Sequence, residues 1–519
     1  MVFIRTKIAI PLLTAAALFF GMSGMDALAG DNNAEIRYYG DLDGDEVISS
    51  YDLVMLRQCI YDYERFDTAQ HYVSDLDADG TIEKSDLELL SDYLLGKISV
   101  FPAGEYITKD IYAPAQISFI EPSITAMGAS MPSQGDAGMV VFCVDFPDCR
   151  FSAEPDMNEM EAAVFGAEDT FSPMYPFESI AAFYKRTSKG TMNVTGKVFR
   201  YTTKESKSEY DSNKVKLAKE CFSAFDSSFD FSSLDCNNDG YIDSTLFTVP
   251  GEADKSNWWP CAGGFGDSWY RVDGVGVGHI ITGNSVLSYG KSNDDFVHSY
   301  CHELGHCIGL PDYYLYKSED SEGMHGLAGT ELMDTDCSTD FSAFSKLMCG
   351  WFKDEQVQIY DPSKGEQSFL LTNAQTASGN CLIIPNGTLA NGYFSEFFIL
   401  EYSTASGNNL GAKQLTWWQD ISSGVKVFHI SAEKQTEYWT FFRYASGTDY
   451  TNNNLGRRLI RIIDDVDKDN FYRTGDVITS SISGFNWYDQ SGYQSVAPEV
   501  KITVGELTGD SYTVTVTPV

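Results

Sequence analysis

Two histidines four residues apart stand in the sequence VHSYCHELGHCIGLPD, which spans residues 297–312. If this segment is a helix, His302 and His306 project from one face, where two imidazoles can bind one zinc ion. Glu303 stands beside the first of them and can take a proton from the water that such an ion binds. The segment therefore predicts metal-assisted hydrolysis, with Glu303 moving the proton.

A catalytic zinc ion usually has three protein ligands and a fourth position for water, whose pKa falls towards about 7. Asp312 stands ten residues after His302, where the metzincin pattern has its third ligand, more commonly a histidine. A carboxylate is a competent zinc ligand, so we expect Asp312 to complete the site, with Glu331 and Asp334 as the alternatives. Met333 is a candidate for the Met-turn beneath the metal.

These ligands need a helix that begins just before them and ends just after them. Asn293 or Asp294 can cap its start. Gly309 lets the backbone turn out of the helix, and Pro311 prevents its continuation. His298 lies one turn before the first ligand and either supports it or packs in the core.

The remaining polar side chains near this segment have weaker expectations. Tyr313 and Tyr314 follow the third ligand closely enough to be candidates for stabilising a transition state. His279 and His325 are near in sequence only, and we expect no role for them. His429, in the distal part of the chain, is expected to pack within a sheet.

A second kind of metal site is indicated near the N-terminus, where carboxylates alternate along two short segments, residues 41–52 and 75–86. Such spacing lets oxygen atoms from loop positions 1, 3, 5, 7 and 12 converge on one calcium ion. Gly80 provides the sharp turn at position 6 of the second loop, whereas Glu46 stands there in the first and is expected to weaken it. The predicted calcium ligands are Asp41, Asp43, Asp45, Val47 and Asp52 in the first loop, and Asp75, Asp77, Asp79, Thr81 and Asp86 in the second.

Apolar residues recur at helical spacing after each loop, so each repeat is expected to be a loop followed by a helix, without a regular entering helix. This duplication resembles a dockerin, the module that attaches enzymes to cohesins of cellulosome scaffolds, over residues 36–98. The resemblance implies a cohesin partner, contacted at loop positions 10 and 11. These are Ser50 and Tyr51 in one repeat and Lys84 and Ser85 in the other, so the two faces are not equivalent.

With the zinc segment in hand, the rest of the chain is similar to the immune inhibitor A family of secreted metallopeptidases. The similar segments are MVVFCVDFPD at residues 139–148, the helix and turn at 179–190, and the stretch 341–351 after the candidate Met-turn. The likeness extends over about residues 136–519. It implies a zinc-dependent peptidase acting on proteins or peptides.

A third oxygen-rich loop lies within this region. Asp235, Asn237, Asp239, Tyr241 and Asp243 occupy positions 1, 3, 5, 7 and 9 of a calcium-type loop, but position 12 is a leucine and a strand is expected to follow. The family resemblance implies a structural calcium loop inside the peptidase. A metal-free turn rich in Asp and Asn is the alternative.

The expected fold class is α+β. It comprises an α-helical calcium-binding dockerin at 36–98, a linker at 99–135, a metzincin-like zinc peptidase domain at 136–365 and a β-rich C-terminal region at 366–519. In the catalytic domain, a twisted sheet should be backed by the zinc helix. The distal third alternates apolar and polar residues between turn signals, which is typical of antiparallel sheet.

Composition excludes several other classes of protein. The chain has 519 residues with 36 basic and 74 acidic side chains, a formal net charge of −38, which disfavours a nucleic-acid partner. Its apolar fraction of 43% and aromatic fraction of 14% are sufficient for a large core and argue against disorder.

The first 29 residues are typical of a secretory signal peptide. Arg5 and Lys7 precede an apolar stretch that ends near residue 22, and Ala27 and Ala29 fit cleavage before Gly30. A membrane anchor is the alternative reading of this segment. No later stretch approaches the roughly 20 apolar residues of a spanning helix, so we expect an extracellular protein without membrane insertion.

The eleven cysteines are scattered, contain no CxxC pair and are odd in number, which disfavours a sulfur-rich zinc site. Cys143 and Cys149 could form a disulfide, and free buried thiols are the equal alternative. Neither reading changes the metal chemistry expected at the histidines.

The sequence thus predicts a secreted zinc endopeptidase that a calcium-dependent dockerin attaches to a cohesin-bearing scaffold. One alternative is a catalytically silent binding protein on a peptidase-like frame, which the intact His302, Glu303 and His306 argue against. The other is a glycan-processing enzyme, which would need a pair of carboxylates across a sugar-binding cleft.

Overall fold

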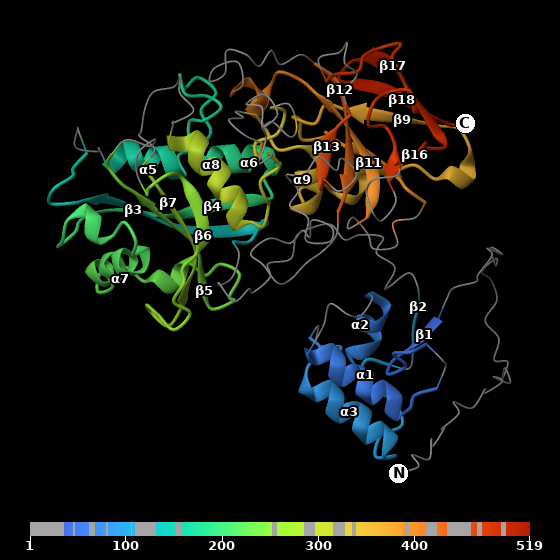
Figure 1. Ribbon diagram of the computed structural model, residues 1–519, viewed down its shortest axis with the longest axis horizontal. Coiled ribbons are helices and arrows are strands. Elements are labelled where there is room, and N and C mark those ends of the chain that lie inside the picture. Colours follow the sequence, from blue (N-terminus) through green and yellow to red (C-terminus); the bar gives the residue numbers. More distant parts are fainter. Residues whose placement is uncertain are drawn as a thin grey trace, which may run out of the picture. The chain divides into compact units, whose positions relative to one another are not determined.

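The computed structural model describes residues 36–44, 47–61, 68–78, 81–104, 106–108, 131–151, 157–251, 257–284, 296–314, 327, 329–334, 339–387, 389, 395–411, 423–432, 458–463, 470–488 and 495–519. It divides into two compact units, Met1–Gln116 with Ala390–Gly392, and Ile117–Leu389 with Tyr393–Val519 (Figure 1). The predicted signal peptide, His325 and the helix caps Asn293 and Asp294 lie outside the described residues. No helix in the described part of the chain has the length and apolar character needed to cross a membrane.

The first unit is built from two short strands and three helices. In chain order these are β1 (Ile36–Tyr38), α1 (Ser50–Tyr61), α2 (Thr68–Ser74), α3 (Lys84–Leu94) and β2 (Tyr106–Thr108). The helices predicted after each loop are confirmed as α1 and α3, and Leu56 and Leu90 from them are fully buried in one small core. The expectation that no helix enters a loop is wrong for the second repeat, because α2 ends directly before Asp75.

The segment after α3 belongs to this unit as well. Phe101 is buried in the same core and its ring stacks on Tyr93 with centroids 4.8 Å apart. β2 then pairs antiparallel with β1, so the two ends of the unit meet. The predicted start of the linker at residue 99 is therefore too early, because Phe101, five residues after Gly96, completes the core of this unit.

A five-stranded sheet organises the N-terminal part of the second unit. Its order is β4 (Met192–Thr202), β3 (Gly135–Asp145), β5 (Tyr241–Thr248), β7 (Gly276–Gly283) and β6 (Cys261–Gly264). The first four strands are parallel, whereas β6 runs antiparallel to β7 at the edge. Parallel strands are covered on both faces, which explains why the run from Met139 to Val144 in β3 is apolar throughout.

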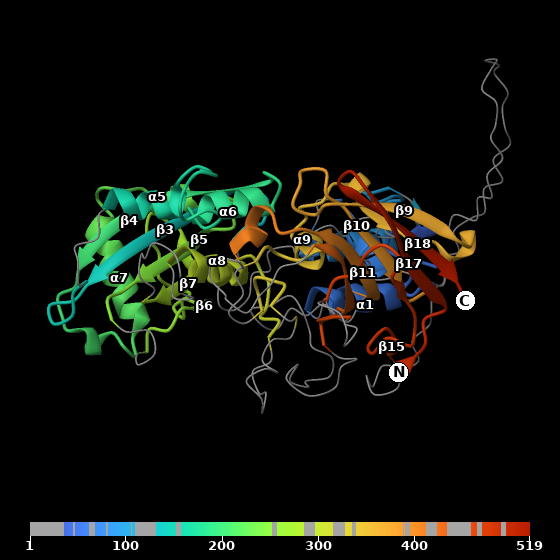
Figure 2. The same cartoon turned by 90° about the horizontal axis from the view of Figure 1, so that it is seen from above.

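Helices cover the two faces of this sheet (Figures 1 and 2). On one face, α5 (Met157–Phe165), α6 (Ile180–Thr187) and α8 (Phe296–Cys307) share a core with Met139 and Val141 of β3. On the other, α7 (Lys214–Phe225) packs with Val140 and Phe142. Alternation along one strand thus divides its side chains between two cores.

The C-terminal part contains two larger sheets and a short hairpin, β15 (Trp487–Tyr488) with β16 (Ser495–Val496). One sheet has the order β13 (Ile460–Ile462), β12 (Gly424–Ser431), β11 (Glu396–Ser403), β10 (Cys381–Pro385) and β8 (Val357–Ile359). The other has β14 (Val477–Ile478), β17 (Val500–Thr508), β18 (Ser511–Pro518) and β9 (Gln367–Thr372). Apart from the parallel β8–β10 pair, all pairings are antiparallel, as predicted.

The five-stranded C-terminal sheet joins two cores. One face, with Phe398 and Leu400 of β11, packs against the four-stranded sheet. The other face, with Phe397 and Ile399, shares the core of α8 and of α9 (Ala343–Met348). The chain as a whole is mixed α/β, a coarser description than the predicted α+β metzincin-like peptidase, and the β-rich region is continuous in its packing with the predicted catalytic domain.

His429 lies in this sheet, as predicted, within a small buried polar group. Its Nε2 is 2.8 Å from Glu396 Oε1, and Arg461 Nε donates to its Nδ1 at 3.4 Å. The ring is fully buried beside Tyr488. Burial, together with the charge of Arg461, lowers the pKa of His429 to about 4, although Glu396 acts in the opposite direction.

This depressed pKa predicts a loss of stability in mild acid. In the unfolded chain His429 takes a proton near pH 6.5, whereas in the fold it stays neutral down to about 4. Its stabilising contribution is therefore complete above about pH 6.5 and declines as the pH falls towards 4, by up to about 3 kcal/mol. We expect the loss of unfolding free energy between about pH 7 and pH 5 to be smaller in His429→Gln than in the wild type, measured by denaturant titration; equal losses in both would contradict this assignment.

Candidate metal centre

Helix α8 and the turn that follows it bring the predicted ligands together. His302 and His306 lie one turn apart on α8 with ring centroids 5.1 Å apart. The helix ends at Cys307, and Gly309 two residues later has a φ of 96°, which suits glycine. Leu310 N–H donates to Gly305 O and Gly309 N–H to His306 O, both at 3.0 Å, which is a Schellman turn. The turn predicted at Gly309 is thus confirmed, and it directs the chain back over the helix.

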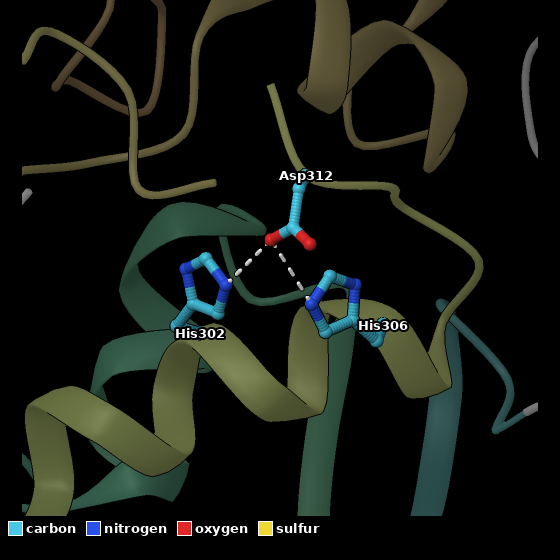
Figure 3. A group of neighbouring side chains, drawn as sticks. All are labelled: His302, His306 and Asp312. Carbon is cyan, nitrogen blue, oxygen red and sulfur yellow. Dashed lines mark hydrogen bonds and ion pairs between the residues drawn. The ribbon is translucent and has the colours of Figure 1, made fainter. Parts of the chain in front are cut away.

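Three candidate metal ligands, His302, His306 and Asp312, converge above α8 (Figure 3). Asp312 Oδ1 is 3.0 Å from His302 Nε2 and 3.3 Å from His306 Nε2. On the far side of each ring, Nδ1 donates to a backbone carbonyl, Leu332 O for His302 and Leu310 O for His306, both at 2.8 Å. Since carbonyls only accept, both Nδ1 atoms carry hydrogen and both Nε2 atoms face the carboxylate, an arrangement that suits zinc.

The electrostatics of this group call for positive charge between the three side chains. Burial lowers the pKa of His302, but the hydrogen bond and charge of Asp312 outweigh it and raise that pKa to about 9. The pKa of His306 is raised for the same reason. Burial raises the pKa of Asp312, yet the two histidines hold it well below its usual range. A divalent cation would supply the positive charge that protons on the histidines otherwise supply beside Asp312. These three ligands therefore fit a zinc ion.

Glu303 lies next to this group without belonging to it. Its side chain is on α8 and buried, and burial raises its pKa, with the two histidines acting in the opposite direction. The backbone N–H of Ala262, in the edge strand β6, donates to its carboxylate. No residue pattern indicates this bond, because a backbone N–H in a short glycine-containing strand has no residue signature.

The alternatives for the third ligand have other partners. Glu331 accepts hydrogen bonds from Ser342 N–H and, at 3.4 Å, from Met333 N–H, and its burial raises its pKa to about 7. Asp334 Oδ2 accepts from the N–H groups of residues 327 and 329 at 3.0 and 2.9 Å. Among the described residues, Asp312 lies together with the two histidines, whereas Glu331 and Asp334 do not belong to this group.

Met333 lies directly against the helix between the two histidines. A Cβ added to Gly305 would be 2.5 Å from the Met333 sulfur, so only glycine permits this approach. Met333 O also accepts from Tyr313 N–H at 2.8 Å, which fixes the residue after Asp312. This placement is the one expected of a Met-turn beneath the site.

The other histidines and tyrosines near the site in sequence differ in their surroundings. His298 is buried with its ring edge against Phe177, so core packing describes it, and His279 is buried in β7. Tyr313 is buried and its hydroxyl lies 3.0 Å from that of Ser345. Tyr314 stays beside the site, with its ring stacked 6.4 Å from that of His302.

Two acidic clusters occur in the first unit at the predicted loops. Asp41, Asp43 and Asp52 form one, and the equivalent residues Asp75, Asp77 and Asp86 form the other, each with carboxylate oxygens within 4.8 Å of one another. The position-12 residues are fully buried, and burial raises the pKa of both. Of the other predicted ligands, Val47 and Thr81 are described, whereas Asp45 and Asp79 lie outside the described residues.

The backbone also uses these position-12 carboxylates. Asp52 accepts from Leu42 N–H at 2.9 Å and from Ser49 N–H at 2.7 Å. Asp86 accepts from Leu76 N–H at 2.7 Å and from Glu83 N–H at 2.9 Å. The two loops therefore have the same internal bonding, which matches their repetition in the sequence.

The predicted cohesin-contact positions are at the surface of the same unit. Tyr51 is 55% exposed, and Ser50 beside it is exposed as well. Lys84 forms an exposed ion pair with Glu88 at 2.7 Å, whereas Ser85 donates to Glu83 at 3.3 Å. At these positions one repeat thus has an exposed aromatic side chain and the other an exposed ion pair, in keeping with non-equivalent faces.

The third oxygen-rich loop is bonded mainly within itself. Asp235 accepts from the N–H groups of Asp239 and Gly240, both at 3.0 Å, and Asp239 accepts from Asn237 Nδ2 and Tyr241 N–H, both at 2.9 Å. Its three carboxylates do not form a cluster like the others, although all of residues 235–243 are described. This geometry is closer to the metal-free turn than to the predicted calcium loop.

Asp243, the last of the predicted ligands in that loop, is turned towards the sheet. Its Oδ2 accepts from Gly138 N–H of β3 at 2.7 Å, and burial raises its pKa to about 7. Its role in the described structure is therefore to join the loop to the sheet. The nearby Cys143 and Cys149 are both free thiols, so the disulfide considered for them is not formed.

Comparison with known proteins identifies the first unit. Residues 39–95 match the family of the dockerin type I domain, so the predicted dockerin is confirmed over that range. Dockerin domains bind calcium, which is consistent with the ligands predicted in the two loops. The match ends before residue 136, and the resemblance of the remaining chain to immune inhibitor A peptidases stays a prediction.

Individual proteins are also similar to the chain, among them an enzyme and a dockerin complex. A multidomain esterase of Ruminococcus flavefaciens is 39% identical over 77 residues, which are 15% of this chain and 10% of that protein. The chain thus aligns with about a tenth of the length of this curated relative. A chain from the complex of the third cohesin ScaC with the ScaB dockerin of Acetivibrio cellulolyticus is 35% identical, with 12% of this chain and 90% of that chain covered and a TM-score of 0.12. That TM-score adds nothing to the sequence match.

The choice of third ligand can be tested by two matched substitutions. We expect Asp312→Asn to weaken zinc binding by roughly 100-fold or more, because it removes the charge that faces both Nε2 atoms. Asp334→Asn should keep zinc, since its carboxylate accepts backbone hydrogen bonds from Leu327 and Gly329 that an amide oxygen can also accept. Competition with a chromogenic chelator measures both affinities, and loss of zinc from Asp334→Asn alone would transfer the ligand role to Asp334.

Proposed function

We propose that the second unit is an extracellular zinc-dependent endopeptidase and that the dockerin attaches it to a cohesin-bearing scaffold. The observation that carries the catalytic part is the convergence of His302, His306 and Asp312 beside the buried Glu303. The signal peptide predicted at residues 1–29 supports export.

The proposed chemistry divides between the metal and Glu303. The Nε2 atoms of His302 and His306, together with Asp312, would hold a zinc ion, which would supply Lewis acidity to a peptide carbonyl and to the attacking water. Glu303 accepts the proton of that water on its carboxylate and delivers it to the leaving amine nitrogen. Burial favours the protonated form of Glu303, and the donor from Ala262 favours the ionised form, so the carboxylate is suited to holding the proton only transiently.

The edge strand supports a peptide as the substrate. β6 ends the sheet order, and its outer edge has no strand partner among the described residues. An extended peptide can pair with such an edge through backbone hydrogen bonds. Because Ala262 of β6 also donates to Glu303, a peptide on this edge would pass close to the group that moves the proton. A sugar chain offers no equivalent row of backbone donors and acceptors.

The resemblance to the immune inhibitor A family agrees with this proposal. The segments that carry it form β3, α6 and α9 with its flanking residues, which surround or support α8. A catalytically silent binding protein remains the alternative. It is disfavoured because His302, His306 and Asp312 lie together and the buried Glu303 stands beside them on α8.

The dockerin type I domain supports a cohesin as the protein partner. Its two acidic clusters offer calcium sites that would hold α1 and α3 in their binding arrangement. The multidomain esterase that shares this segment is itself named as an enzyme, so the pairing of such a domain with a hydrolase has a parallel.

The role of Glu303 predicts that Glu303→Gln keeps zinc but lowers kcat against casein by roughly 100- to 10,000-fold, because the amide cannot accept the proton. Glu159→Gln is the control, since Glu159 is an exposed glutamate on α5. Zinc content and cleavage rate are measured on both variants and the wild type. Casein cleavage by zinc-loaded Glu303→Gln at the wild-type rate would remove Glu303 from the mechanism.

The docking part is tested separately from catalysis. We expect Asp86→Asn to abolish calcium-dependent retention on immobilised type I cohesin, because it removes charge from the second acidic cluster. Asp92→Asn is the matched control on the same helix, where the carboxylate bonds only to the exposed Lys97 among the partners described. Retention of Asp86→Asn that equals the control, with calcium and after chelation, would contradict a docking role for this loop.

A further inference from the structure

A buried ion pair joins the two central strands of the C-terminal sheet near the candidate metal centre. Glu401 of β11 and Lys426 of β12 are direct cross-strand neighbours. Lys426 Nζ is 2.7 Å from Glu401 Oε1, and the side chains are only 4% and 1% exposed. Removing two charges from water costs free energy that their attraction often fails to offset, so stability alone does not explain such a pair.

Each partner makes a second bond outside the sheet. Lys426 Nζ donates to Thr330 O at 3.3 Å, and Ala343 N–H, at the start of α9, donates to Glu401 Oε2 at 2.7 Å. Thr330 begins the turn that contains Leu332 and Met333, and Ala343 follows Ser342, whose N–H donates to Glu331 in that turn. The ion pair is therefore bonded to the turn directly at Thr330, and it is linked to Glu331 through the start of α9.

The 330–333 turn contacts two parts of the candidate metal centre. Leu332 O accepts the hydrogen of His302 Nδ1 at 2.8 Å and so orients that ring. Met333 O accepts from Tyr313 N–H at 2.8 Å, which fixes the residue next to Asp312. A shift of the turn would therefore move both a nitrogen ligand and the carboxylate ligand.

We propose that the Glu401–Lys426 ion pair is a positioning element of the metal centre, holding the 330–333 turn where its carbonyls orient His302 and the Asp312 segment. This inference rests on the proposed function, since it concerns how firmly the site binds zinc. The two charged residues touch neither metal nor substrate and act through the turn. Partners beyond the ligands commonly change metal affinity by about 10- to 100-fold.

A second buried ion pair provides a matched comparison. Lys346 Nζ is 2.5 Å from Asp340 Oδ2, with side chains 1% and 5% exposed. Asp340 is bonded further to Asn408 Nδ2 at 3.1 Å, in the 3₁₀ helix η8 (Gly407–Leu410). Neither side chain has a bond to the 330–333 turn among those described, so this pair has the same burial without the proposed connection.

The test uses the full chain and compares Glu401→Gln/Lys426→Met with Asp340→Asn/Lys346→Met. Both double variants remove an ion pair with little change in volume, and thermal melts establish that they fold. We expect the first to release zinc to excess chelator about 10- to 100-fold faster than the wild type. Its cobalt-substituted form should also show a changed visible spectrum. The second should match the wild type in both measurements.

If the first double variant does not fold, Glu401→Gln alone decides by the same measurements, because the amide keeps the shape but removes the charge that holds Lys426 Nζ beside Thr330 O. A folded variant with wild-type zinc release and wild-type cobalt spectrum overturns the positioning role. Equal acceleration by the Asp340–Lys346 control does so too, since it would assign the effect to general loosening. Failure of the wild type itself to bind zinc is a different result, which refutes the proposed function.

Discussion

Two imidazole nitrogens and one carboxylate oxygen of the second unit converge on one point, and their arrangement favours positive charge there. Asp312 faces both Nε2 atoms, while backbone carbonyls hold the opposite Nδ1 atoms. Without a cation this group must retain protons, as the raised pKa of His302 indicates. A zinc ion would meet the same electrostatic demand and, under the proposed function, would also supply a Lewis acid for hydrolysis.

Three separate parts of the fold supply that geometry. The Schellman turn after α8 returns Asp312 over the helix, the 330–333 turn supports His302 from the other side, and the edge strand β6 holds Glu303. The 330–333 turn is bonded to the C-terminal sheet through Lys426, and the start of α9 is bonded to the same sheet through Glu401. The β-rich region is thus a structural part of the site, and it shares a core with α8 and α9.

The parts of the site that were predictable from sequence are those with local geometry. His302 and His306 are four residues apart on one helix, and Asp312 follows a glycine turn, so spacing alone brings the three together. The repeated acidic loops were visible for the same reason, and the dockerin type I match covers them. Backbone groups such as Leu332 O and Ala262 N–H have no residue signature and reach the site through long-range packing. The pairing of Glu401 with Lys426 has no sequence signal either, because a strand pattern does not reveal that opposite charges will be paired and buried.

The metal assignment is tested most directly by zinc-edge X-ray absorption on the purified wild-type protein, with the zinc content determined on the same sample. The account predicts one zinc per chain bound by two imidazole nitrogens and oxygen donors, with bond lengths of about 2.0 to 2.2 Å and no sulfur near 2.3 Å. A folded protein without stoichiometric zinc, or a spectrum dominated by sulfur ligands, would contradict it.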